Sequence, residues 1–267
     1  MIKYCSIGSG SCGNCHFVGY KDTNILIDAG LSGKRISDGI KDIGEDAEKL
    51  RGIFITHEHS DHIKGAGIVS RKYNIPIFAN IETWRSMKEK LGKIEKENMI
   101  VFENDRNYSL GDLIIRPFSI EHDAANPVGY NMCANGGSEK ISIATDIGII
   151  TENVRRNLYR SKLVVLESNY DKNMLMAGSY SYALKRRVMS DVGHLSNDEA
   201  GKFCVDLIKN GTDRILLAHL SKENNFPELA YETSKGILKE NQMSIGSDVN
   251  LDVLLRNSIS DIYKVAP

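Results

Sequence analysis

The stretch Phe54–Gly65, FITHEHSDHIKG, constrains this chain more than any other part of its sequence. It places His57, His59, Asp61 and His62 within six residues, directly after a short apolar run. A run this short predicts a buried strand rather than a helix. Imidazole and carboxylate groups at a strand end are typical of metal sites, and two histidines two residues apart can converge on one ion. A polar loop that binds no metal is the alternative interpretation.

Three further stretches put a potential ligand at the end of an apolar run, namely His122, Asp146 and His219. Each alone could be a capping aspartate or a buried histidine with satisfied hydrogen bonds. Together they fit a site built by loops on a rigid sheet. The four side chains of the first stretch would crowd one tetrahedral ion, so we predict two ions. One would be held by His57, His59 and His122, and the other by Asp61, His62 and His219, with Asp146 between them.

Short β-branched runs alternate with amphipathic segments along the chain. We expect strands at 1–7, 16–20, 23–30, 51–56, 75–80, 99–104, 113–120, 128–134, 140–148, 162–169, 213–220 and 249–254. We expect helices at 37–50 (N-cap Ser37 or Asp38), 61–73, 151–160, 196–210 and 227–240, and a long helical stretch running through 183–190. This order predicts an α/β sandwich with two sheets inside and helices outside. Since no repeat, low-complexity tract or Pro/Gly-rich linker interrupts residues 1–267, we expect one domain.

Composition indicates the broad class of protein. Apolar content of 41% and charged content of 26% are ordinary for a soluble globular protein. We find no signal-peptide pattern and no apolar run near the roughly 20 residues of a membrane span. With five cysteines, an odd and sparse set, this predicts a cytoplasmic protein without membrane contact. A net charge of −1 argues neither for nor against nucleic acid, and nothing indicates an oligomeric state.

The ligand pattern resembles the metallo-β-lactamase family. The motif HxHxDH, preceded by a strand ending in LIDAG and followed by isolated His, Asp and His residues, matches that family in order from Asp28 to His219. The resemblance implies an αββα sandwich of two mixed sheets flanked by helices, with a dinuclear site at the edge between them. Asp28 matches the family's aspartate that lies behind the ligands and orients a ligand histidine.

A second pair of residues narrows the chemistry. Glu167 in LVVLESNYD and His194 in DVGHLSNDEA resemble the glutamate and histidine of tRNase Z-like phosphodiesterases. A histidine held by a carboxylate can protonate a leaving alkoxide. The alternative is that His194 only precedes a helix, since Ser196 to Glu199 has the pattern of a capping box. Both interpretations can hold together.

Within the nucleases, the interval between Asp146 and His219 has no room for the β-CASP insertion of RNase J-like enzymes, and the interval between His122 and Asp146 has no long Gly/Pro-rich arm like that of tRNase Z. The stretches GSGSCGNC, HDAANPVGY, ATDIG, LESNYD, GHLSN and HLSKENN resemble the YycJ/WalJ type. This resemblance implies a compact 5′–3′ exonuclease on nucleic acid, specifically DNA. It would use two divalent ions (Zn²⁺ or Mn²⁺, alternatively Fe²⁺), a bridging hydroxide held by Asp61, and His194 as general acid. The alternatives are a small-molecule hydrolase of the glyoxalase II kind, acting on a thioester or lactone, and a non-catalytic metal-binding module.

The glycine-rich start, GSGSCGNC, has two interpretations. Cys12-x-x-Cys15 could suggest a zinc knuckle, but His16 is the only further ligand nearby. A flexible turn is favoured over a zinc knuckle, and two forms of it stay open: its backbone amides (Gly8 to Asn14) could approach a phosphate, or it could be a plain hairpin turn. The weaker candidates for substrate contact are Ser9, Ser11, Asn14 and Ser221.

Overall fold

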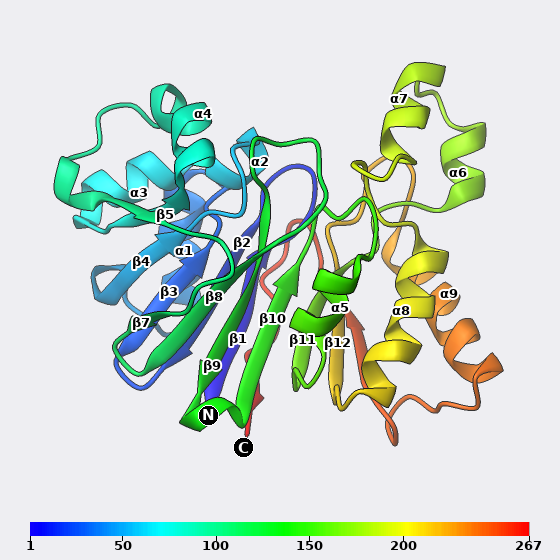
Figure 1. Ribbon diagram of the computed structural model, residues 1–267. Helices are drawn as coiled ribbons and strands as arrows, with labels where there is room; N and C mark the ends of the chain where they lie inside the picture. The colour runs from blue at the N-terminus through cyan, green and yellow to red at the C-terminus, as the bar shows by residue number, and fades with distance from the viewer. Residues whose placement is uncertain (267) are drawn as a thin grey trace.

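A computed structural model describes residues 1–266, and its strands form two facing sheets of seven strands each. The first sheet has the order β14-β1-β2-β3-β4-β5-β6 and the second the order β13-β12-β11-β10-β9-β8-β7. Helices cover the outer face of each sheet, so the layers run helix, sheet, sheet, helix (Figure 1). The predicted αββα sandwich is confirmed.

The first sheet is antiparallel on one side and parallel on the other. It contains β1 (Ile2–Gly8), β2 (Cys15–Tyr20), β3 (Thr23–Ile27), β4 (Leu50–Phe54), β5 (Ile77–Asn80), β6 (Met99–Phe102) and β14 (Tyr263–Val265). The strands from β14 to β3 pair antiparallel, and those from β3 to β6 pair parallel. The carboxyl ends of β3 and β4 therefore lie at one edge, where the motif FITHEHSDH leaves the sheet.

The second sheet repeats this plan. It contains β7 (Tyr108–Leu110), β8 (Leu113–Ser119), β9 (Val128–Ala134), β10 (Glu139–Ala144), β11 (Leu163–Glu167), β12 (Arg214–Ala218) and β13 (Asn250–Val253). Strands β7 to β10 pair antiparallel, and β10 to β13 pair parallel. Every residue of β11 is buried, as expected for a parallel strand covered on both faces.

Two helical layers flank the sheets. The first sheet carries α1 (Gly33–Asp42), α3 (Ala66–Tyr73) and α4 (Ile81–Leu91), with the single turn α2 (Ser60–Ile63) at its edge. The second carries α5 (Glu152–Leu158), α8 (Asn197–Lys209) and α9 (Pro227–Glu240). Helices α6 (Lys172–Ala177) and α7 (Tyr182–Val188) form an arm above the strand ends (Figure 1), and short 3₁₀ turns lie at Ala47–Lys49, Lys96–Asn98 and Asn135–Gly137.

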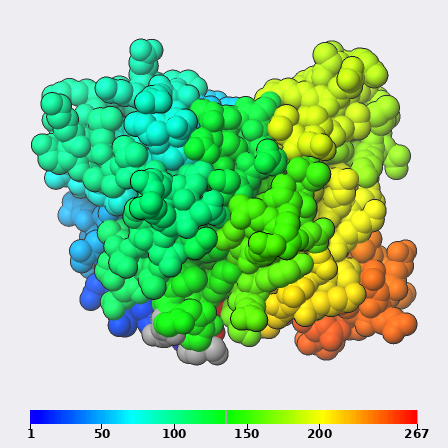
Figure 2. Space-filling view, viewed as in Figure 1, coloured from blue at the N-terminus to red at the C-terminus, as the bar shows by residue number. Residues whose placement is uncertain are grey.

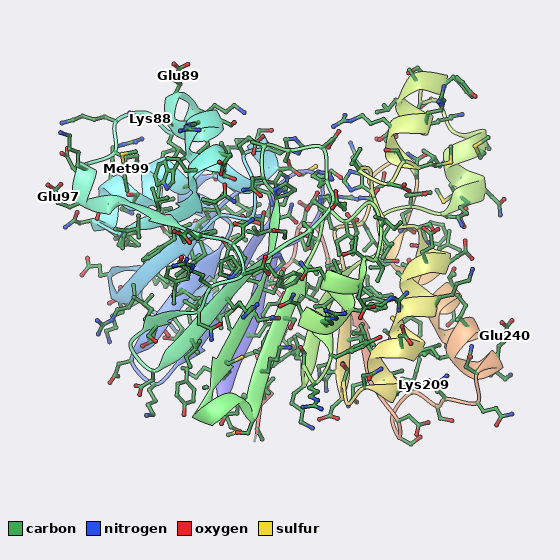
Figure 3. All side chains as sticks on the ribbon, in the orientation of Figure 1. Lys88, Glu89, Glu97, Met99, Lys209 and Glu240 are labelled. Carbon is green, nitrogen blue, oxygen red and sulfur yellow. The ribbon has the colours of Figure 1, made fainter. Side chains whose placement is uncertain are left out.

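The apolar core has three parts that match these layers. Side chains such as Tyr130 and Phe54 fill the space between the sheets. A second cluster, including Ile36 and Trp84, joins the first sheet to its helices, and a third, including Phe203, does the same for the second sheet. Charged side chains such as Lys88, Glu89, Lys209 and Glu240 point outward from the helical layers (Figure 3). Among the residues described, no helix has the length and apolar character that crossing a membrane requires.

The helix predicted at 37–50 was wrong at both ends. It begins at Gly33 after Ser32, whose side chain accepts a hydrogen bond from the backbone of Arg35, and it ends at Asp42. Neither Ser37 nor Asp38 is its N-cap, because Ile36 and Ile40 turn one face of the whole segment into the core. Residues 47–49 form a separate 3₁₀ turn after Gly44, whose φ of 76° ends the helix.

Other differences have similarly local causes. The stretch predicted at 61–73 divides at Gly65, where a Cβ would lie 2.3 Å from the carbonyl oxygen of Leu31. The long helical stretch is two short helices, because Ser181 caps a second one. Helix α4 was missed because Asn80 ends β5 and caps α4 at the same residue, so no loop separates them. The short strands β7 and β14 were also missed.

Candidate metal centre and active site

The first group of candidate ligands leaves the sheet in the loop after β4. His57 and His62 are fully buried, and Asp61 lies at the start of α2. Asp28, at the end of β3, accepts hydrogen bonds from the backbone N–H of Thr56 at 2.8 Å and from His62 Nδ1 at 2.7 Å. This places the Nε2 atom of His62 toward the site, as expected for an aspartate that orients a ligand.

A close backbone contact holds this loop against the turn that follows β3. The turn after β3 passes directly under Asp61, and a Cβ at Gly30 would lie 1.6 Å from the Asp61 carbonyl oxygen. The backbone N–H of Asn14 donates to that same oxygen at 2.8 Å. Only glycine fits at position 30, so β3 and the candidate ligand loop are held as one unit.

The second group comes from separate strand ends. His122, Asp146 and His219 follow β8, β10 and β12, one each. Asp146 and His219 have φ of 58° and 55°, and Asp28 in the first sheet has φ of 60°. This left-handed conformation is uncommon outside glycine but is enriched in Asp, Asn and His. It turns each side chain back across the end of its strand, toward the gap between the sheets.

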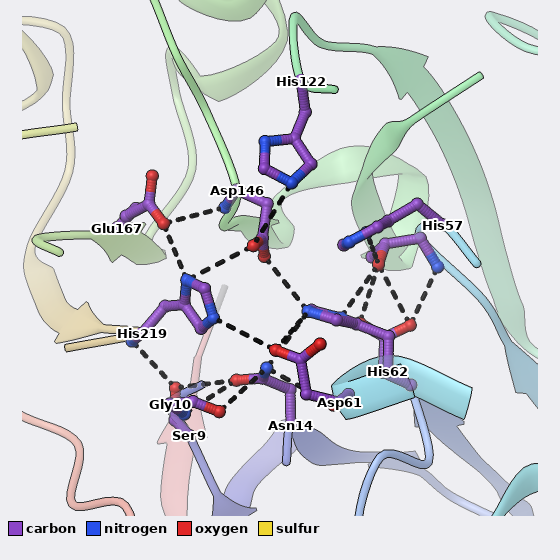
Figure 4. Close-up of polar contacts among 12 residues, drawn as sticks. Ser9, Gly10, Asn14, His57, Asp61, His62, His122, Asp146, Glu167 and His219 are labelled. Carbon is purple, nitrogen blue, oxygen red and sulfur yellow. Dashed lines mark hydrogen bonds and ion pairs between the residues drawn. The ribbon is translucent and has the colours of Figure 1, made fainter. Parts of the chain in front are cut away.

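The structure brings the predicted ligands together in the predicted groups. Potential ligand atoms lie within 4.8 Å of one another in each of the following sets: His57, His59 and His122; Asp61, His62 and His219; and His57, His62 and Asp146. Asp146 lies between the first two, because its carboxylate is 3.3 Å from His62 Nε2 and 3.8 Å from His122 Nε2. Figure 4 shows Asp146 between His62 and His122. That these atoms bind metal stays a prediction.

Unpartnered buried atoms test whether a cation fits. Within residues 1–266, His57 Nε2, His219 Nε2 and Asp146 Oδ2 are buried without a hydrogen-bond partner. Two of them have close polar neighbours without a hydrogen bond, since Asp146 Oδ2 lies 3.3 Å from His62 Nε2 and His219 Nε2 lies 3.6 Å from Asp61 Oδ2. Leaving buried polar atoms without hydrogen bonds is costly, and a cation among them would partner all three. The other ring nitrogens are already engaged, since His57 Nδ1 lies 3.0 Å from Thr56 Oγ1 and His219 Nδ1 lies 2.7 Å from Glu167 Oε1. The free atoms are the ones that face the centre, which fits metal ions.

The electrostatics of the site point the same way. Burial lowers the pKa of His62, but the carboxylates of Asp146, Asp28 and Asp61 outweigh it and raise that pKa to about 9. Burial raises the pKa of Asp61, but His62 and His219 outweigh it and hold that pKa well below its usual value. Buried carboxylates thus attract positive charge to this centre, which protons can supply and which divalent cations supply when they displace those protons.

Glu167, at the end of β11, connects more of the site than the sequence indicated. Its buried carboxylate accepts from His194 Nδ1 at 2.9 Å and from His219 Nδ1 at 2.7 Å. It also accepts from the backbone N–H groups of Asp146, Ile147 and Leu195 at 3.2, 3.0 and 2.9 Å. One side chain therefore holds three loops, two after strands and one between α7 and α8, whereas we predicted only its contact with His194.

His194 has both of the features considered from the sequence. Ser196 and Glu199 form a capping box at the start of α8, two residues after it. Burial lowers the pKa of His194, but the Glu167 carboxylate outweighs burial and raises it. Because Nδ1 contacts Glu167 and the side chain is 22% exposed, Nε2 is the nitrogen available to a substrate.

Buried side chains of the glycine-rich turn (residues 8–15) contact the candidate ligands. Ser9 and Asn14 are buried: Ser9 Oγ accepts from the His219 backbone N–H at 3.0 Å, and Asn14 Nδ2 lies 3.1 Å from His62 Nε2. The backbone amides of residues 10, 13 and 14 have internal acceptors, so they are unavailable to a phosphate. By contrast, Ser11 and Ser221 line a cavity beside His194. Cys12 is exposed and Cys15 buried, both as free thiols.

Three contributors to the site were missed. Thr56 contacts both Asp28 and His57, and its position next to the motif was the available signal. The Gly193 carbonyl oxygen accepts from His122 Nδ1 at 3.0 Å, a backbone contact with no sequence signature. Glu58, inside the motif, accepts from the Ala125 backbone N–H at 2.9 Å and so fixes the loop that carries His122.

Comparison with known families agrees with this geometry. The family described as "Beta-lactamase superfamily domain" matches residues 23–220, which include all the candidate ligands. The chain belongs to the beta-lactamase superfamily. Its recognition from the HxHxDH pattern is confirmed.

Within this superfamily, the chain is similar to two curated exodeoxyribonucleases over most of its length. The exodeoxyribonuclease YycJ of Bacillus anthracis is 37% identical over 245 residues, covering 92% of each chain. The exodeoxyribonuclease WalJ of Streptococcus pneumoniae serotype 2 is 37% identical over 249 residues, again covering 92% of each. The crystal structure of the metallo-β-lactamase fold protein YhfI from Bacillus subtilis has a TM-score of 0.72 at 16% identity, covering 97% of this chain and 98% of that one, and shows the shared fold. These findings identify an enzyme of the metal-dependent hydrolase class.

Proposed function

We propose that this protein is a DNA exonuclease of 5′–3′ polarity that depends on two divalent metal ions. Its identity with two exodeoxyribonucleases over 92% of the chain supports the substrate class. The observation that carries the reaction type is Glu167, which contacts His194 and His219 through the same oxygen, Oε1. A proton donor is thereby held next to a candidate metal ligand, as cleavage of a phosphodiester requires.

The two groups of side chains would hold one ion each, with Asp146 between them. Nitrogen and oxygen donors of this kind suit Zn²⁺ or Mn²⁺, and also Fe²⁺. When bound, such ions would neutralise phosphate charge and lower the pKa of water to give a nucleophile near neutral pH.

The remaining steps belong to the polypeptide. Asp61 is the more open of the carboxylates, 22% exposed, and its Oδ2 lies 3.6 Å from both His62 Nε2 and His219 Nε2, so it would orient the attacking water. His194 would donate its Nε2 proton to the leaving oxygen, and Glu167 would hold the resulting neutral ring in place. Asp28 keeps His62 aligned throughout.

A time course on DNA and RNA single strands, each labelled at the 5′ or the 3′ end, tests this proposal. With Mn²⁺ added, the wild-type protein should shorten DNA stepwise, and the labels report the direction. His194→Ala and Asp61→Ala should both fail while circular dichroism shows the same fold. If oligonucleotides stay intact although bound metal is detected by mass spectrometry, a thioesterase or lactonase becomes the better assignment. In that case His194→Ala should leave thioester hydrolysis unchanged.

The rest of the proposal concerns the whole chain. We propose that residues 1–267 act as one domain, since the candidate site draws on strand ends of both sheets. All five cysteines, which lie within the described residues, are free thiols, and this supports a reducing cytoplasm as the location.

A further inference from the structure

A cavity of about 160 Å³ lies beside the candidate active site, next to the α6–α7 arm (residues 172–188). Its lining includes Ser11, Asn169, Tyr180, Arg187, His194 and Asn224. In the space-filling view the molecular surface dips between this arm and the lobe formed by α3 and α4 (Figure 2), and the arm rises on one side of that dip (Figure 1). Because His194 is part of the wall, the cavity opens onto the proposed proton donor.

The arm and His194 are rigidly connected. The backbone N–H of His194 donates to the carbonyl oxygen of Val188, the last residue of α7, at 2.9 Å. Gly193 packs so closely there that a Cβ would lie 2.3 Å from the carbonyl oxygens of Arg187 and Val188. These contacts hold the end of the arm against the loop that carries His194, so a ligand bound between them would lie beside the proton donor.

The lining has the chemistry of a nucleoside site. Asn224 also lines the cavity, but it is 1% exposed and its side-chain Oδ1 lies against Gly178 of the arm, where a Cβ would be 2.8 Å from it. The half-buried ring of Tyr180 offers a face on which a base can stack. Arg187 is exposed at the rim, paired with Asp123.

We propose that this cavity seats the base of the 5′-terminal nucleoside of the DNA strand, with the 3′ oxygen of that nucleoside facing His194; this inference rests on the proposed nuclease function. Water adds to phosphorus, the bond from phosphorus to the 3′ oxygen breaks, and that oxygen keeps the electron pair and takes the proton from His194. The products are the released terminal nucleotide and a strand with a new 5′-phosphate. A cavity of about 160 Å³ has room for one base and not for a continuing strand, so the terminal base enters it and cleavage falls at the first phosphodiester.

The test uses DNA strands that lack one base. Initial cleavage rates are measured for an intact single strand, for the same strand with a tetrahydrofuran abasic residue at its 5′ end, and for one with that residue at its 3′ end. Wild type, Tyr180→Ala, Tyr180→Phe and Tyr182→Ala are compared. Tyr182 is the matched control, because it belongs to the same arm but is 74% exposed and outside the cavity lining.

We expect the 5′ lesion to slow the first cut by the wild-type protein about tenfold or more, because base–aromatic stacking is lost. The 3′ lesion should have no effect. Tyr180→Ala should cut intact DNA and the 5′-lesion strand at similar rates, whereas Tyr180→Phe and Tyr182→Ala should discriminate like the wild type. Equal wild-type rates on all three strands, unchanged discrimination in Tyr180→Ala, or slowing only by the 3′ lesion would overturn the inference while leaving the nuclease assignment intact. A wild-type protein that cuts none of the strands would instead overturn both.

Discussion

The two sheets supply the candidate site in different ways. The first sheet contributes four potential ligands from one loop of six residues, and they are held by nearby residues of the same sheet, Asp28 and Thr56. The second sheet contributes one side chain from each of several strand ends, and Glu167 holds them together. Figure 4 shows these two halves facing each other. The first half is a local motif, whereas the second exists only once the sheet has formed.

The two halves should also differ in their sensitivity to a single substitution. In the first half, two separate contacts hold the ligand loop: the close backbone approach at Gly30 and the hydrogen bond that Asp28 accepts from His62. In the second, five hydrogen bonds converge on the single buried carboxylate of Glu167. We therefore expect the second half to be more sensitive to one substitution, and the predictions below test this from the largest effect to the smallest.

Metal removal should affect both halves at once. A chelator should abolish turnover, and mass spectrometry should find two ions in each wild-type chain. His57→Ala and His219→Ala should each lose about one ion, because they belong to different groups of ligand atoms. His194→Gln is the control: it should keep both ions and still lose activity. Loss of both ions from either alanine variant would show that the halves do not act separately.

Among the residues that position the candidate ligands, Glu167→Gln should be the most damaging change. The neutral amide cannot accept from both His194 and His219 while also serving three backbone N–H groups, so proton donation and loop geometry are lost together. We expect turnover on DNA to fall by roughly 10³-fold. The free energy of unfolding should drop by about 3 kcal/mol, as when a buried charged pair is broken. Urea unfolding of the metal-free protein measures this. An activity loss below tenfold would contradict the central role of Glu167.

Asp28→Asn is the matching change in the first half and should have a smaller effect. The amide keeps the size of the side chain and tolerates its left-handed backbone, but it weakens the contact with His62 Nδ1. We expect metal affinity to fall by about 10- to 100-fold, with activity restored by excess metal. Competition with a metal-binding dye gives the affinity. If Asp28→Asn cost more than Glu167→Gln, the comparison between the halves would be reversed.

Gly30→Ala should disturb the first half through backbone position alone, without removing any functional group. The added methyl overlaps the Asp61 carbonyl oxygen, so the loop must shift at a cost of about 1–3 kcal/mol in the free energy of unfolding. Gly236→Ala is the control, since a Cβ there meets nothing within 4 Å in helix α9, and it should stabilise the protein by about 0.5–1 kcal/mol. Thermal unfolding of both variants, with and without metal, separates the two effects. Equal melting temperatures would contradict the packing argument.

The sequence was most informative where chemistry and chain position coincide. His57, His59, Asp61 and His62 follow a strand within one loop, so their grouping could be predicted, and the sandwich followed from the order of strands and helices. Helix α4 could not be placed, because its N-cap Asn80 is also the last residue of β5. The first helix was misplaced because its core-facing residue Ile36 lies before the cap we favoured.

The second half of the site was predictable only in part. His122, Asp146 and His219 could be listed as strand-end residues, but which of them meet depends on the order of strands in the sheet. That Glu167 also holds His219, and that the Gly193 carbonyl oxygen holds His122, depends on tertiary contacts between loops far apart in sequence. Such contacts leave no periodicity or spacing to detect.

The left-handed backbone at Asp28, Asp146 and His219 has a consequence for mutational scanning. An alanine at these positions removes a functional group and also strains the main chain, since alanine tolerates positive φ less readily than Asp, Asn or His. Scores from an alanine library would therefore overstate the chemical importance of these three sites relative to His57 or His122. Asparagine substitutions keep the conformation, so an asparagine scan would rank the chemical contributions on an equal footing.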